Sequence, residues 1–111
     1  MVYDKLVRDK IPKLYESEGK ICVTEELEME HFANKLLETL DSEIESFKKA
    51  FNAEDDELAV KKIADSVEVF YAILDLIGVT KESFEKIRLA KCNKFGGFEG
   101  RILLKEIVDK K

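Results

Sequence analysis

The chain has 111 residues, of which 45% are hydrophobic and 39% are charged, and its net charge at pH 7 is −5. This length predicts a single domain spanning residues 1–111, with enough apolar content for a core. The acidic balance argues against a protein that binds a nucleic-acid backbone. No apolar run is long enough to cross a bilayer and no signal peptide begins the chain, so we expect a cytoplasmic protein without a membrane partner.

The N-terminal third of the chain predicts two helices joined by an extended segment. The first helix is short, with Asp9 as its N-cap, Pro12 in its first turn and Gly19 as its stop. Residues 20–27 alternate apolar and polar side chains, which predicts a short extended segment. From about residue 28 to residue 51 apolar side chains recur every three or four positions, which predicts a long amphipathic helix.

A third helix is predicted between the connector at residues 52–56, where Asp55 or Asp56 caps it, and Gly78. It is apolar on two faces. The larger face collects Val60, Ile63, Ala64, Val67, Phe70, Tyr71 and Leu74. The opposite face collects Leu58, Val69, Ala72 and Leu76, with Asp65 among them. Such a helix is expected to be central in the fold and covered on both sides, with Phe70 and Tyr71 in the core.

The C-terminal part of the chain predicts a fourth helix, capped by Thr80 and ending near Gly96 and Gly97. Residues 101–108 are too apolar to remain in water, so we expect them to pack on the body of the protein or on a second subunit. These elements predict an all-α fold, a four-helix bundle. The two apolar faces of the third helix predict a homodimer, or a dimer of dimers, that completes the core.

Asp65 is the first candidate for chemistry, because a carboxylate on an apolar face must be protonated, paired or bound to a metal. Glu43 on the second helix leans toward the apolar stripe, so the two carboxylates can converge if the helices form a hairpin. Glu68 follows Asp65 by three residues and lies on the same side. Carboxylates on facing helices suit Mg²⁺, which completes its shell with substrate phosphates. The structural alternative is an ion pair of Asp65 with Lys61 or Lys62.

Four segments together resemble the MazG-like all-α nucleoside triphosphate pyrophosphohydrolases. They are YDKLVRDKIP at residues 3–12, the Glu-bearing second helix, IADSVEVFYAI at residues 63–73 and GGFEGRILL at residues 96–104. The opening segment is similar to that of the small house-cleaning branch of this superfamily. The resemblance implies a helical dimer or tetramer that depends on Mg²⁺ and hydrolyses NTP to NMP and pyrophosphate, a reaction catalysed mainly by positioning and charge neutralisation.

The motif of this superfamily is Glu-x-x-Glu on one helix and Glu-x-x-Asp on the next. Its positions in this chain are Glu43, Ser46, Lys62 and Asp65, so two of the four carboxylates are replaced. Because ligand charge governs the affinity for the ion, we expect Mg²⁺ (or Mn²⁺) to bind weakly.

Three interpretations of the altered motif stay open. Glu68 and Glu45 stand in as metal ligands, Glu68 also serving as a base; or Lys62 contacts a phosphate and partly replaces the ion; or catalysis is lost and the fold is kept. The last interpretation gives a non-catalytic helical homodimer that binds a nucleotide or a protein partner. Arg8 and Lys91 are further candidates for binding substrate phosphates, the alternative being surface charges or salt bridges to the acidic helices.

Overall fold

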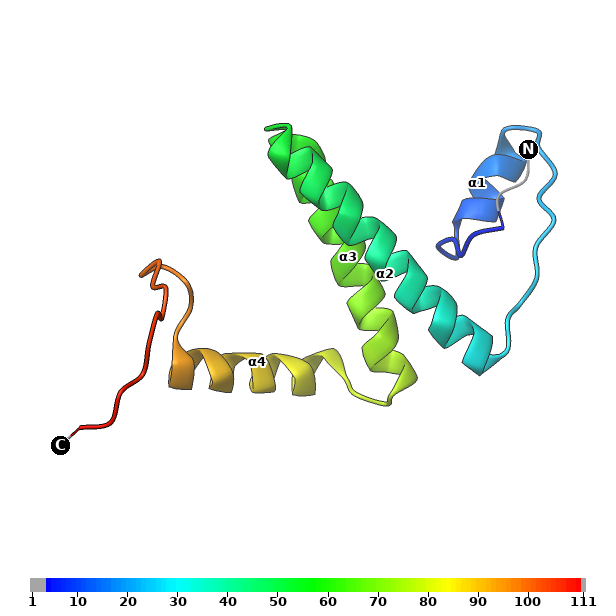
Figure 1. The fold of residues 1–111 in the computed structure, drawn as a ribbon. Helices are drawn as coiled ribbons and strands as arrows, with labels where there is room; N and C mark the ends of the chain where they lie inside the picture. The colour runs from blue at the N-terminus through cyan, green and yellow to red at the C-terminus, as the bar shows by residue number, and fades with distance from the viewer. Residues whose placement is uncertain (1–3, 111) are drawn as a thin grey trace. The chain divides into compact units, whose positions relative to one another are not determined.

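The computed structural model describes residues 4–110, and within this range all the regular secondary structure is helical. Its helices are α1 (Ile11–Ser17), α2 (Met29–Asn52), α3 (Asp56–Leu76) and α4 (Lys81–Phe95) (Figure 1). The chain separates into two compact units, one ending at Gly78 and one beginning at Val79. The all-α class is thereby confirmed, while the single-domain organisation stays a prediction. None of the helices in the described range is both long enough and apolar enough to span a bilayer.

Helix α1 begins one residue later than the capping pattern predicts. Its N-cap is Lys10, whose side chain makes no capping hydrogen bond, so the assignment of Asp9 as N-cap is wrong. The reason is a turn in front of the helix, in which the N–H of Ile11 donates to the carbonyl of Arg8 at 3.0 Å and Asp9 lies inside the turn. Pro12 occupies the first turn as predicted, where its missing N–H costs no intrahelical bond.

Residues 20–28 connect α1 to α2 and form neither a helix nor a strand. The predicted extended segment therefore joins no sheet in the described part of the chain. Cys22 lies in this connector, with its Sγ 3.7 Å from the carbonyl oxygen of Pro12. Both cysteines are free thiols.

The ends of the longer helices follow the predicted capping residues. The Asp55 carboxylate accepts a hydrogen bond from the N–H of Leu58 at 3.2 Å and caps α3. The Thr80 hydroxyl caps α4 in the same way, with an N–H three residues further on as the donor. Past the end of α3, Gly78 has a φ of 78°, a left-handed conformation that favours glycine. Gly96 has the same role after α4, with a φ of 82°.

Helices α2 and α3 form a hairpin and pack along each other (Figure 1). The buried side chains of this hairpin are Leu36 and Ala50 on α2, and Ala59, Ser66 and Val69 on α3. Most of them are small, which lets the helix backbones approach closely. The buried Ser66 hydroxyl donates to the carbonyl oxygen of Lys62 one turn earlier, at 2.8 Å, so it needs no partner on α2.

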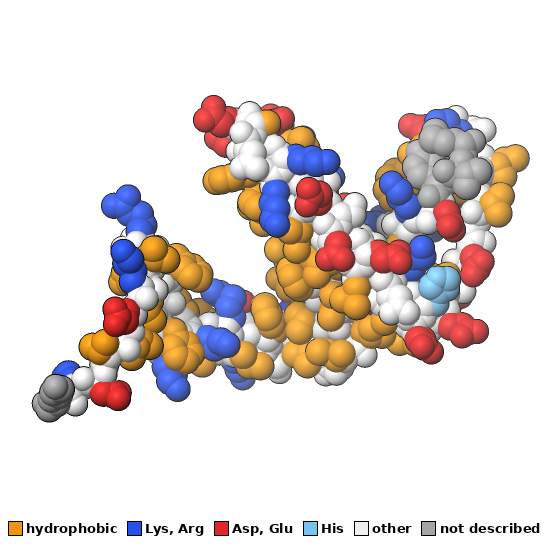
Figure 2. All heavy atoms as spheres, viewed as in Figure 1, with side chains coloured by type: hydrophobic (Ala, Val, Ile, Leu, Met, Phe, Trp, Pro, Cys, Tyr) orange, Lys and Arg blue, Asp and Glu red, His pale blue; other side chains and the backbone are white. Residues whose placement is uncertain are grey.

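Within the described residues of one chain, the covered side of α3 carries Ala59, Ser66 and Val69, of which only Val69 belongs to one of the two apolar faces. The larger face remains open: Val60, Ile63, Val67 and Phe70 are between 38% and 64% exposed. We call these four residues the open face of α3. In Figure 2 hydrophobic side chains gather over the α2–α3 hairpin. One chain therefore leaves the larger face uncovered, Phe70 included, and burial of this face by a second subunit stays a prediction.

The second unit consists of α4 and the segment that follows it. The apolar side chains of this segment are exposed: Ile102, Leu103, Leu104, Ile107 and Val108. Their packing on the body of the protein or on a second subunit stays a prediction. Exposed aliphatic side chains of this kind form a surface whose burial lowers the free energy.

Candidate functional site

A cluster of four charged side chains lies on the α2–α3 hairpin. It consists of Glu43 from α2, Lys62 and Asp65 from α3, and Arg8 from the segment before α1; we call it the charged cluster. Helical periodicity explains its placement on α2, because Glu43 lies two turns after the buried Leu36. On α3, Lys62 and Asp65 are within one turn of the buried Ser66.

The two carboxylates of the cluster share one ammonium group. Lys62 Nζ lies 3.4 Å from Glu43 Oε2 and 3.9 Å from Asp65 Oδ2. The side chains of Glu43 and Lys62 are 22% and 26% exposed, so water reaches both without surrounding them. Glu43 and Asp65, which come from different helices, thus converge on one cationic group, as the hairpin argument predicted.

Asp65 has a second cationic partner. Arg8 donates from a terminal guanidinium nitrogen to Asp65 Oδ1 at 2.7 Å, across 57 positions of sequence. The Asp65 carboxylate therefore faces Arg8 with one oxygen and Lys62 with the other. By formal charge the cluster is neutral. Since its members are partly exposed, each ion pair contributes at most about 1 kcal/mol to stability, so the cluster can rearrange at a low cost in free energy.

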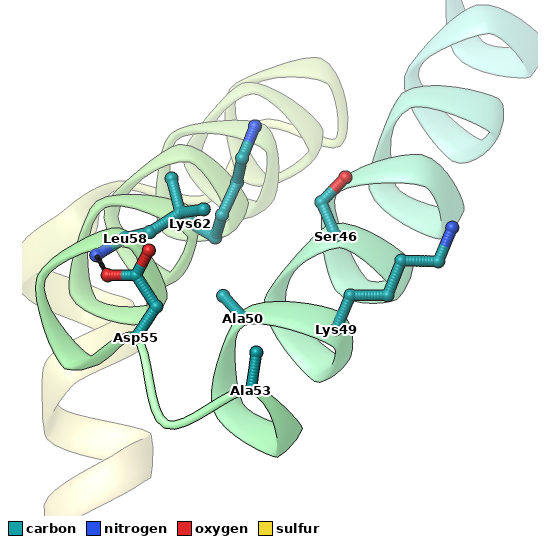
Figure 3. A pocket seen from close by; sticks show the side chains of 7 residues that line it. All are labelled: Ser46, Lys49, Ala50, Ala53, Asp55, Leu58 and Lys62. Carbon is teal, nitrogen blue, oxygen red and sulfur yellow. Dashed lines mark hydrogen bonds between the residues drawn. The ribbon is translucent and has the colours of Figure 1, made fainter.

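A pocket of about 340 Å³ lies beside the cluster, where α2 and α3 are joined. Its lining residues are Ser46, Lys49, Ala50, Ala53, Asp55, Leu58 and Lys62 (Figure 3). Figure 3 shows Ser46 on α2 pointing toward α3, and Lys49 pointing away from α3. Its dashed line marks the capping hydrogen bond of Asp55.

Two facts connect the pocket to the cluster. Lys62 belongs to both, because it lines the pocket and holds Glu43. In addition, Ser46 and Lys62, the two positions at which the resemblance predicts carboxylates that this chain lacks, both line the pocket. They give the pocket wall a neutral hydroxyl and an ammonium, which are groups that bind phosphate oxygens better than metal ions.

The donor set offers a divalent cation a partial site. Glu43 and Asp65 are two converging carboxylates, and Mg²⁺ in nucleotide enzymes is bound by one or two carboxylates plus substrate phosphates. Residues 4–110 contain no group of three or more His, Cys, Asp or Glu side chains that could hold a metal ion. The residues present thus fit Mg²⁺ when phosphates complete its shell, with the Lys62 ammonium moved off Glu43.

The remaining candidate ligands lie outside the cluster. Glu68 and Glu45 are exposed and join no three-ligand group in the described range. Lys61 pairs with Glu57 on its own helix at 3.5 Å, so the ion pair predicted for Asp65 forms with Lys62. The metal and base roles of Glu68 stay predictions.

Sequence reasoning left the partner of Arg8 open. Arg8 was a candidate for phosphate binding or for a salt bridge to the acidic helices, and the structure shows the salt bridge, with Asp65 on α3 as the partner. No spacing rule links positions so far apart along the chain, and Arg8 was singled out only as a basic residue of the opening segment. Lys91 lies exposed on α4 in the other compact unit, and its phosphate-binding role stays a prediction. Comparison with family models, with curated proteins and with solved structures finds no match.

Proposed function

We propose that this chain is a MazG-like protein that binds nucleoside triphosphates and, with Mg²⁺ or Mn²⁺, hydrolyses them to NMP and pyrophosphate. One observation carries the proposal: Glu43 and Asp65, on different helices, approach the same ammonium group at 3.4 and 3.9 Å. Two carboxylates that converge from different helices supply hard oxygen ligands to a divalent cation once the ammonium moves off them. The resemblance of the opening, central and closing segments to the superfamily supports the reaction class.

The side chains of the cluster divide the work between cation and phosphate. Glu43 and Asp65 would hold the ion, with Glu68 as a further ligand or as the base that accepts a proton from the attacking water. The bound ion supplies charge neutralisation at the phosphates and lowers the pKa of a water molecule. Lys62 and Arg8 donate to phosphate oxygens, and Lys91 is the third residue proposed to do so. Phosphoryl transfer requires mainly this positioning and neutralisation.

A second candidate function is a non-catalytic homodimer that binds a nucleotide or a protein partner. Two observations favour it. The Lys62 ammonium and the Arg8 guanidinium together already neutralise the carboxylate pair. No group of three potential metal ligands exists among residues 4–110. A chain with this arrangement binds phosphate through Lys62 and lacks the charge needed to hold the ion tightly.

We also propose that the functional form is a homodimer, or a dimer of dimers, joined through the open face of α3. Four large apolar side chains exposed on one helix form a surface that association would cover. Ile63→Glu places a charge in the middle of this face and should shift sedimentation to the monomer. Lys61→Glu, on the polar side of the same helix, is the control and should leave the oligomer intact. A monomeric wild-type protein would refute the dimer.

Pyrophosphate release separates the two candidate functions. The protein is incubated with a panel of canonical and modified NTPs plus Mg²⁺ or Mn²⁺. Pyrophosphate release that is lost in Asp65→Ala and kept in Asp75→Ala supports the enzymatic function. Asp75 is an exposed acid on the same helix and serves as the control. Nucleotide-dependent thermal stabilisation without release supports the binding module. Silence in both measurements refutes the enzyme and the nucleotide-binding module, and leaves a protein partner as the ligand of the second candidate.

A further inference from the structure

We propose that Lys62 is a switch between the carboxylate pair and the adjacent pocket. Without ligand, its ammonium lies on Glu43 and beside Asp65, whose other oxygen is held by Arg8; a phosphate-bearing ligand in the pocket draws the ammonium away and frees Glu43 and one oxygen of Asp65 for a divalent cation. Phosphate and cation then bind cooperatively, and neither binds well alone. This inference deepens the proposed function and rests on it for the class of ligand, a molecule with several phosphate groups.

The position of one side chain carries the inference. Lys62 contacts Glu43 across the hairpin and Asp65 along α3, and the same side chain forms part of the pocket wall (Figure 3). A lysine has a flexible four-carbon stem and a compact charge with three donors, so it changes partners by rotating its side chain alone. The backbone of α3 need not move.

Charge explains why the two ligands depend on each other. A divalent cation is repelled by an ammonium that already occupies its carboxylate ligands. An oligophosphate, which carries several negative charges, competes for the same ammonium against carboxylates that also have water as a partner. Each ligand therefore removes the obstacle to the other. By thermodynamic linkage the gain in affinity is equal in both directions.

The neighbouring lysines lack the double contact. Lys61 pairs with Glu57 on the exposed side of α3 and does not line the pocket. Lys49 lines the pocket but points away from α3 in Figure 3. Lys61 therefore provides a control that changes the same charge on the same helix without touching the cluster.

The first experiment tests the anion side without any metal. Binding of inorganic tripolyphosphate is measured by calorimetry in the presence of EDTA for wild type, Glu43→Gln and Glu45→Gln. Glu43→Gln releases Lys62 and should bind about fivefold tighter than wild type, the factor expected from loss of one partly exposed ion pair. Glu45→Gln removes the same charge from an exposed position of α2 and should change affinity less than about twofold.

The second experiment tests the cation side without any phosphate. Binding of Mn²⁺ alone is followed by electron paramagnetic resonance for Lys62→Met and Lys61→Met. Methionine keeps the length of the stem and removes the charge, and circular dichroism checks that α3 remains helical. Lys62→Met should bind Mn²⁺ about tenfold tighter than Lys61→Met, because only the former removes the ammonium from Glu43 and Asp65, while Arg8 stays on Asp65 in both variants.

Equal tripolyphosphate affinity of Glu43→Gln and Glu45→Gln would overturn the switch. So would equal Mn²⁺ affinity of the two methionine variants. If either equality holds while wild-type protein still releases pyrophosphate or is stabilised by nucleotides, the switch fails and the proposed function stands. If no variant binds nucleotide or tripolyphosphate, the proposed function fails together with the switch.

Discussion

Restoring the two missing carboxylates gives a quantitative prediction about the site. The variant Ser46→Glu with Lys62→Glu replaces a hydroxyl on α2 and the shared ammonium on α3. Lys62 lies 3.4 and 3.9 Å from the two existing carboxylates, so a carboxylate at this position is within ligand distance of the same ion. In this variant we expect a group of four acids, whereas in the wild type two carboxylates are paired with cations.

The size of the effect follows from Coulomb's law. Two unit charges 4 Å apart interact by about 1 kcal/mol in water and by about 4 kcal/mol at an effective dielectric constant of 20. Glu43 and Lys62 are only about a quarter exposed, so the site lies between these limits. Because the ion is divalent and residue 62 changes from positive to negative, screening still leaves a gain of at least about 1.4 kcal/mol, or tenfold in affinity.

The assay is a titration with Mn²⁺ or Mg²⁺ at fixed salt, by calorimetry. Without metal the double variant should also melt at a lower temperature than wild type, because it concentrates like charges and loses the Lys62 ion pairs. Metal should restore the melting temperature. The control is Lys61→Glu, which makes the same charge change as Lys62→Glu but outside the cluster. A double variant that binds the ion no tighter than Lys61→Glu would refute the placement of the cation site.

Three further predictions concern the fold. Leu36→Ala should lower the free energy of unfolding by about 2–5 kcal/mol in urea titrations, because Leu36 is only 3% exposed. Leu37 is 54% exposed, so Leu37→Ala should change the same free energy by less than about 1 kcal/mol. Equal losses would contradict the packing of the hairpin. Gly78→Ala should cost about 1 kcal/mol by the same measurement, because its φ of 78° is left-handed and a Cβ there meets no other atom. The hydrogen bond from Arg88 lowers the pKa of the Glu85 carboxyl. The stabilisation from this hydrogen bond is therefore present above the pKa of Glu85 in the unfolded chain and is lost as the pH falls through its pKa in the folded chain. An NMR titration in which Arg88→Gln leaves the midpoint of Glu85 unchanged would contradict this.

The helix ends could be predicted because their causes are local. Asp55 and Thr80 cap α3 and α4 with side-chain oxygens that accept an N–H three residues on. Gly78 and Gly96 follow the same helices in left-handed conformations. Asp9 failed as a cap because the turn that Ile11 closes onto Arg8 moved the helix start by one residue.

The choice of packing face could not be predicted from helical periodicity. A helical wheel showed two apolar faces of α3 and favoured burial of both, with the bulky Phe70 in the core. The hairpin instead buries Ala59, Ser66 and Val69, of which only Val69 belongs to one of those faces, because small side chains allow the two helices to approach closely. Periodicity reports where apolar side chains lie on a helix, whereas the fit between two surfaces decides which side is covered.

The candidate site was partly predictable. Convergence of Glu43 and Asp65 followed from helix faces and a hairpin, and the structure confirms it. The pocket and the Arg8 contact arise from the three-dimensional path of the chain, so no local pattern announced them. Lys62 was noted in the sequence as a substitution in the motif, but only the three-dimensional structure shows that it lies between two acids.

The ammonium shared by Glu43 and Asp65 also has an evolutionary consequence. Lysine and glutamate codons differ at their first base alone, so a single nucleotide change converts residue 62 between a built-in counter-ion and a metal ligand. Serine 46 lies more than one base change from glutamate. If the proposed cation site is right, a lineage carrying this hairpin can gain or lose metal affinity at residue 62 in one mutational step, while the helices, their caps and their packing are inherited unchanged.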